Sequence, residues 1–128
     1  MKAYKVMTCG LRSCVVDQES EYRSLFSVQY KVGEWVKPNI PKTYLCVFKS
    51  LDSALWFRAT CSGNCVIYTC EIKKARSKIS CLCGVAQDLA DWLIFWNTRG
   101  RKCSYRLSLP HGTKFATEVK ILDEVTNL

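Results

Sequence analysis

The sequence predicts an α+β fold, built as a single domain over residues 1–128 from a mostly antiparallel sheet with two helices. Three observations lead to this prediction. Strand-like runs outnumber helical ones, and the two kinds do not alternate strictly, as a doubly wound parallel sheet would require. One late run, 114–122, alternates apolar and polar residues as a half-buried antiparallel strand does. A length of 128 residues is ordinary for one domain.

The strand-like runs are rich in Val, Ile, Tyr, Phe and Cys and are bounded by Gly, Pro, Asn or Ser. They span residues 3–8, 14–16, 25–32, 44–48, 65–72, 78–83, 103–109 and 114–122. The first predicted helix, 51–59, follows Ser50 as its N-cap. The second, 85–97, carries one apolar stripe formed by Val85, Leu89, Trp92, Leu93 and Trp96.

The run 114–122 is expected to follow a turn, Pro110-His111-Gly112-Thr113. Because side chains alternate along a strand, its residues divide into two faces. One face is predicted to hold Phe115, Thr117, Val119 and Ile121, and the other Lys114, Ala116, Glu118 and Lys120.

The chain is basic, with 19 Lys and Arg against 11 Asp and Glu, a net charge of +8 that both halves share equally. Such a charge attracts nucleotides, nucleic acid or acidic partners. The N-terminus lacks the apolar run of a secretory signal, and the longest apolar stretch, Trp92–Trp96, is too short to cross a bilayer. These features predict a protein of the cytoplasm, of the producing or of a host cell, with no membrane partner.

Nine cysteines fall at positions 9, 14, 46, 61, 65, 70, 81, 83 and 103. The odd count and the predicted intracellular location weigh against a disulfide scaffold, and several lie in apolar runs, where a free thiol behaves as a small hydrophobe. The alternative is a structural zinc site made by Cys61, Cys65, Cys81 and Cys83, although its pair spacing departs from the usual one. No other cofactor is expected.

No catalytic signature is present, and no catalytic residue is predicted. His111 is the only histidine, and neither a Walker-type phosphate loop nor a G-x-G-x-x-G run occurs, which excludes the common ATPase and dinucleotide-binding classes.

Two basic clusters are the stronger indication of function. The first holds Lys73, Lys74, Arg76 and Lys78, and the second holds Arg99, Arg101, Lys102 and Arg106. Arginine binds phosphate in two-pronged fashion, and aromatic rings stack on bases. We therefore expect Arg99, Arg101 and Arg106 to bind phosphate, Lys73, Lys74 and Arg76 to add positive potential, and Tyr105 or Trp96 to stack on a base. The competing interpretation assigns Trp96 to the core and the basic runs to solvated loops.

From Glu21-Tyr22-Arg23 onward, the order of motifs resembles the small ADP-ribosyltransferase fold. The other corresponding pieces are Val47-Phe48-Lys49-Ser50 with Ala54 and Phe57, and Pro110-His111-Gly112-Thr113. Members of that family place a catalytic glutamate shortly before the last turn, and here residues 106–109 hold no carboxylate. The resemblance therefore implies binding without NAD transfer, and a transferase would need Glu118 or Glu71 as its carboxylate.

A second pattern resembles short uncharacterised open reading frames of phages and other viruses; it consists of Tyr30-Lys31-x-Gly33, Lys37-Pro38, Val47-Phe48-x-Ser50 and Ala54-x-x-Phe57. This resemblance implies a viral accessory protein that sequesters a host's nucleotide immune signal. The prediction is thus a non-enzymatic binding protein for a small phosphorylated, nucleotide-type ligand. A transferase that uses NAD and a basic module for nucleic-acid or protein interaction are the alternatives, and homo-oligomerisation is left open.

Overall fold

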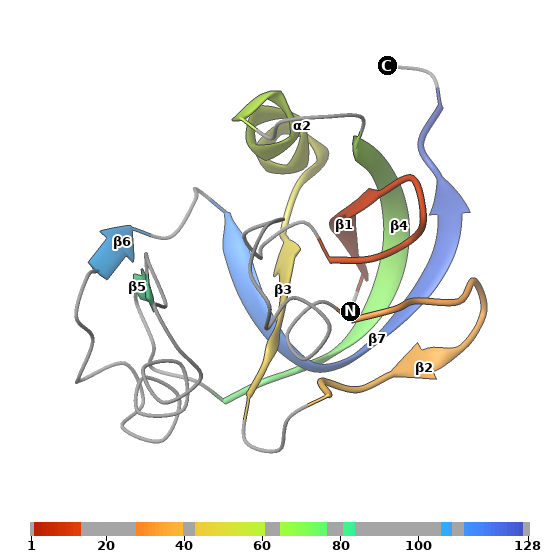
Figure 1. Cartoon of the computed structure of the whole chain (residues 1–128), viewed down its shortest axis with the longest axis horizontal. Helices are drawn as coiled ribbons and strands as arrows, with labels where there is room; N and C mark the ends of the chain where they lie inside the picture. The colour runs from red at the N-terminus through yellow and green to blue at the C-terminus, as the bar shows by residue number, and fades with distance from the viewer. Residues whose placement is uncertain are drawn as a thin grey trace.

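The computed structural model describes residues 2–13, 28–39, 43–60, 65–76, 81–83, 106–108 and 112–126. Its main feature is a closed barrel of four strands: β1 (Lys2–Thr8), β3 (Leu45–Phe48), β4 (Cys65–Lys74) and β7 (Thr113–Glu124). β1 and β7 each pair with both β3 and β4, always antiparallel, so the ring of hydrogen-bonded strands is complete. Figure 1 shows β4 and β7 curving together around one side of this barrel.

The remaining elements attach to the barrel or lie beside it. β2 (Trp35–Val36) pairs with β7, and α2 (Leu51–Thr60) connects β3 to β4. β5 (Cys81–Cys83) and β6 (Arg106–Ser108) form a separate two-stranded antiparallel sheet (Figure 1). Within the described ranges, no helix has the length and hydropathy needed to cross a membrane.

The predicted α+β class with two helices is wrong. The strands close into a barrel, and α2 is the only helix in the part of the chain that the structure describes. Closure depends on the long strand β7, which pairs with β4 along one edge and with β3 and β2 along the other. The second predicted helix, 85–97, lies outside the described residues.

A β-bulge interrupts the alternation of β7. Lys73 pairs with Glu118 and Lys74 pairs with Ala116, so Thr117 is one extra residue on β7. The Thr117 hydroxyl donates a 3.2 Å hydrogen bond to the backbone carbonyl of Lys73. The predicted faces are therefore wrong at this point: Ala116 is fully buried and Thr117 is exposed, because the bulge shifts the pattern by one residue.

A second bulge lies near the end of β7, where one more residue is inserted between the partners of Tyr68 and Cys70. The Thr69 hydroxyl secures it by donating to the carbonyl of Asp123 at 3.3 Å and accepting from the Asp123 N–H at 3.2 Å. Bulges increase the bend and twist of a strand. Two of them in one 12-residue strand allow four strands to close.

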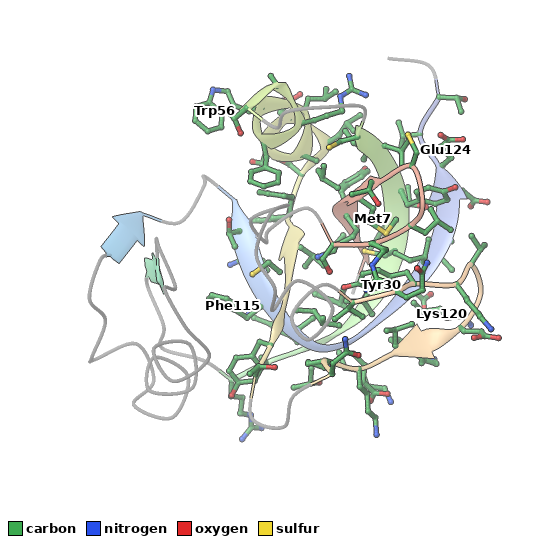
Figure 2. The ribbon with its side chains drawn as sticks, in the orientation of Figure 1. Met7, Tyr30, Trp56, Phe115, Lys120 and Glu124 are labelled. Atoms are coloured by element: carbon green, nitrogen blue, oxygen red, sulfur yellow. The ribbon has the colours of Figure 1, made fainter. Side chains whose placement is uncertain are left out.

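The core fills the barrel interior. Alternation along β1 directs Ala3 and Met7 inward, and Figure 2 shows Met7 and Tyr30 within the ring of strands. The interior cluster consists of Ala3, Met7, Val28, Tyr30, Leu45, Val47, Cys70, Ile72, Ala116, Val119 and Ile121. A barrel of only four strands has no room for a lumen once these side chains are in place.

A second apolar layer lies between α2 and the outer side of the barrel. Val6, Phe48, Ala54 and Ile67 form its buried part. Ser50 caps the helix as predicted, since the Ser53 N–H donates to its Oγ at 3.2 Å. This layer anchors the helix against the strands on either side of it in the sequence.

The other predicted elements have different outcomes. The runs that became β1, β3, β4, β7 and α2 are confirmed, and β5 and β6 occupy parts of the runs 78–83 and 103–109. The described part of run 25–32 makes only isolated bridges, and β2 was not predicted. The run 14–16 lies outside the described residues.

Candidate functional site

The structure describes only part of the site that the sequence predicts. Arg99, Arg101, Tyr105 and Trp96 lie outside the described residues, and Arg106 is described only as part of the backbone of β6. Lys73, Lys74 and Arg76 are all exposed at the end of β4 and just beyond it. The convergence of the two basic clusters therefore stays a prediction, and the geometry around Lys73 can be examined directly.

Lys73 lies beside an aromatic ring that the prediction did not include, Trp35 on β2. The Lys73 Nζ is 5.0 Å from the centre of the Trp35 ring, and the Lys120 Nζ is 6.0 Å from it. The Trp35 residue remains 40% exposed. A cation over an aromatic face is attracted by the ring quadrupole. Two ammonium groups and a solvent-accessible indole thus meet on the outer side of the barrel.

Strand pairing places these groups together. Trp35 on β2 is the register partner of Lys120 on β7, and Lys120 is the partner of Glu71 on β4. Lys73 on β4 is the partner of Glu118 on β7. We call the outer side of the barrel formed by these side chains and Lys37 the Trp35 surface; its members are Trp35, Lys37, Glu71, Lys73, Glu118 and Lys120.

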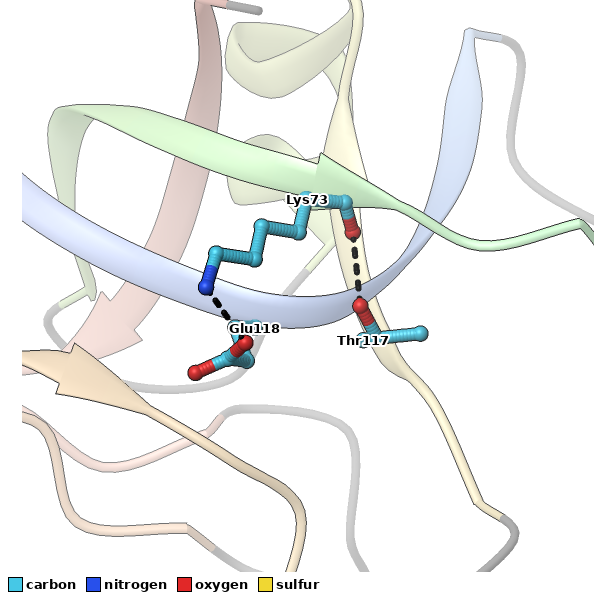
Figure 3. A network of polar contacts seen from close by, with 3 residues as sticks. All are labelled: Lys73, Thr117 and Glu118. Atoms are coloured by element: carbon cyan, nitrogen blue, oxygen red, sulfur yellow. Dashed lines mark hydrogen bonds and ion pairs between the residues drawn. The ribbon is translucent and has the colours of Figure 1, made fainter.

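Lys73 and Glu118 form an ion pair across β4 and β7. The Lys73 Nζ lies 2.8 Å from Glu118 Oε2, as Figure 3 shows. The hydrogen bond from Lys73 lowers the pKa of Glu118, and the charges of Lys73 and Lys37 act in the same direction. A carboxylate whose folded-state pKa is depressed stabilises the fold above its ordinary pKa, and this contribution is lost as the pH falls through the folded-state value.

The Trp35 surface has the parts needed to bind a flat anionic molecule. The indole supplies a stacking face, and the lysines supply point charges that attract phosphate. Lys73 already forms an ion pair with Glu118, so an anion that binds Lys73 must compete with this carboxylate. The two glutamates also offset much of the charge of the three lysines. The arrangement offers a stacking face and cations side by side.

A second group of polar side chains lies in the barrel interior. Lys5 is only 3% exposed, and its Nζ donates a hydrogen bond to the backbone carbonyl of Cys46. The same Nζ is 5.4 Å from the centre of the Tyr30 ring. The Tyr30 hydroxyl is buried and, among the described residues, has no hydrogen-bond partner of standard geometry.

The interior changes the pKa values of these groups. Burial lowers the pKa of Lys5, but its interactions with Tyr30, Cys46 and Cys70 outweigh burial and leave the pKa raised. Burial raises the pKa of the Cys70 thiol to about 11. At neutral pH, Cys70 is therefore a neutral thiol.

The zinc alternative stays a prediction. Cys65 is partly buried at the start of β4, and Cys61 lies outside the described residues. Cys81 and Cys83 belong to β5, whose side chains are not among those described. Within the described ranges, no group of three or more His, Cys, Asp or Glu side chains is placed to hold a metal ion.

The sequence contained signals for the residues that the prediction missed. Lys120 falls on the predicted polar face of run 114–122, and Trp35 follows a Gly-Glu turn, but their proximity depends on which strands pair. Alternation places Lys5 on the same face of a predicted strand as Ala3 and Met7, but it does not say that this face is the interior one.

No family model, curated protein or solved structure matches this chain.

Proposed function

We propose that this chain is a non-enzymatic binding protein for a small phosphorylated ligand with a planar base, and that the Trp35 surface forms at least part of its binding site. One observation supports this proposal above the others. An exposed indole on β2 has the ammonium groups of Lys73 and Lys120 within about cation–π range of its ring. A nucleotide presents the complementary pair of features, a flat base and a phosphate.

In the proposed complex, the base stacks on Trp35, and the phosphate binds Lys73 and Lys120. Glu118 acts as the internal competitor, since it pairs with Lys73 at 2.8 Å when no phosphate is bound. Replacing Glu118 by glutamine keeps the shape of the side chain and removes its charge, so the Glu118→Gln variant is expected to bind the phosphate more tightly. A surface that only covers the barrel gives no such effect.

The experiment is calorimetric titration of the full chain with ADP, adenosine and inorganic phosphate. ADP is expected to bind more tightly than either fragment, because only ADP engages both the ring and the lysines. The Trp35→Ala variant loses the stacking contact, worth about 1–3 kcal/mol per base, which corresponds to roughly 5- to 150-fold weaker binding.

Two matched controls separate the site from general effects. Trp56 is 64% exposed on α2, so Trp56→Ala removes a second exposed indole away from the proposed site. Lys73→Gln removes one of the two cations beside Trp35. Lys49→Gln is its control, because it removes one positive charge at another exposed position. Equal losses in the Trp35 and Trp56 variants, or no binding of ADP by the wild type, would contradict the proposal.

The nucleic-acid alternative predicts a different result in the same assay. Binding of a single strand falls steeply with salt in proportion to the phosphates contacted. The transferase alternative predicts release of nicotinamide when NAD is incubated with the protein. Both remain predictions from the sequence, and no described feature favours them over simple ligand binding.

A further inference from the structure

Lys5 is the only charged side chain that is buried among the described residues. It projects from the middle of β1 into the same interior that Ala3 and Met7 occupy. Buried charges in proteins are nearly always paired, because leaving water is costly for an ion. The group that compensates this buried ammonium must therefore lie in the barrel interior, away from the Trp35 surface.

The hydrogen bonds around Lys5 are incomplete. A lysine ammonium has three N–H donors and no acceptor. The carbonyl of Cys46 accepts one of these hydrogen bonds, and the Tyr30 hydroxyl contacts the ammonium group without reaching standard hydrogen-bond geometry. The hydroxyl of Tyr30, a residue only 1% exposed, has no hydrogen-bond partner of standard geometry among the described residues. Two neighbouring buried groups thus still have donors to offer.

No described carboxylate balances the charge. Each lies outside the barrel interior, exposed or at most half-buried; they are Glu34, Asp52, Glu71, Glu118, Asp123 and Glu124. Cys70, on the interior side of β4, keeps its proton at neutral pH. The cation faces a lining of apolar side chains and thiol.

We propose that the barrel interior binds one small monovalent anion of halide size between the ammonium of Lys5 and the hydroxyl of Tyr30. Both groups donate a hydrogen bond to it, which satisfies the Tyr30 hydroxyl and neutralises the buried cation. The packed interior of a four-stranded barrel excludes larger anions such as phosphate or a nucleotide. This site is separate from the Trp35 surface, so it stands or falls independently of the proposed function.

The first test is thermal unfolding of the full chain at fixed ionic strength while chloride or bromide replaces gluconate. A saturable, halide-specific rise in Tm is expected for the wild type. Tyr30→Phe, which removes a single oxygen atom, is expected to need about tenfold more halide for the same rise, as the loss of one hydrogen bond to a charged partner implies.

Lys5→Met is expected to abolish the halide dependence, because a residue of similar volume replaces the cation. Lys49→Met removes an exposed lysine, keeps the same net charge as Lys5→Met and should retain the full halide effect. If Lys5→Met does not fold, the comparison of wild type with Tyr30→Phe still decides the question.

Crystals soaked in bromide provide the second test. Anomalous scattering from one ordered bromide between Lys5 and Tyr30 is the expected result. A Tm that does not distinguish halide from gluconate, a halide effect that survives in Lys5→Met, or a water molecule alone at this position would overturn the proposal.

Discussion

The buried thiol of Cys70 makes stability at alkaline pH a sharp test of the barrel interior. Cys70 is fully buried on β4, and its pKa is raised from 9.0 to about 11, first because burial disfavours the thiolate. The nearby Lys5 opposes this rise without cancelling it. In the unfolded chain, the thiol titrates near its ordinary value instead.

The direction of the effect follows from these two values. Below pH 9, both states keep the proton, and the thiol contributes no pH dependence. Above pH 9, the unfolded state releases its proton first, so the folded state loses stability until the pH exceeds about 11. The linkage relation gives a loss of about 1 kcal/mol at pH 10, rising towards about 3 kcal/mol at higher pH.

The assay is urea unfolding of the reduced protein at pH 8 and pH 10, comparing wild type with Cys70→Ala. Taking the difference between the two pH values removes the packing cost of the substitution. The wild type should lose about 1 kcal/mol more than the variant, a shift of about 0.5 M in midpoint for a slope of about 2 kcal/mol/M. Cys9→Ala, which removes an exposed thiol, is the matched control. Parallel losses in wild type and Cys70→Ala would refute the burial argument.

Two further predictions concern the backbone. Thr69→Val removes the hydroxyl that exchanges hydrogen bonds with the Asp123 backbone at the second bulge, so the free energy of unfolding should fall by about 1–3 kcal/mol. Thr69→Ser keeps the hydroxyl and should retain most of this stability. Equal stability of the two variants in urea would show that these hydrogen bonds do not stabilise the bulge. Gly112 has a φ of 80°, and an added Cβ would lie 2.3 Å from the Ser53 Oγ. Gly112→Ala should therefore destabilise more than Gly33→Ala, which has a φ of 83° with open space around it and carries only the backbone cost of about 1–2 kcal/mol. Similar thermal shifts for both alanine variants would contradict the predicted clash.

Local features of this fold were readable from the sequence, because they depend on neighbouring residues. The Ser50 cap and the apolar residues of 51–59 identified α2, and alternation identified most of β7. Closure of the barrel was not readable in the same way. It depends on the extra residue Thr117 and a second insertion near Thr69, and threonine in a strand ordinarily signals no bulge.

The candidate site was readable only in part for a related reason. The basic residues at the end of β4 marked Lys73 as a candidate. The side chains that surround Lys73 in space come from β2 and β7, which lie far from it in the sequence. Only strand pairing brings Trp35 beside Lys73 and Lys120. Lys5 is a similar case, since alternation places it on one face of β1 with Ala3 and Met7, but only the closed barrel makes that face the interior.

The indole N–H signals of the four tryptophans offer the most direct measurement of binding at the Trp35 surface. Each signal is assigned by replacing its tryptophan with phenylalanine, and ADP is then added to the isotope-labelled protein. The account predicts a saturable shift of the Trp35 signal, no shift of the Trp56 signal, and a lower half-saturating concentration in Glu118→Gln. A Trp35 signal that stays in place at millimolar ADP would contradict it.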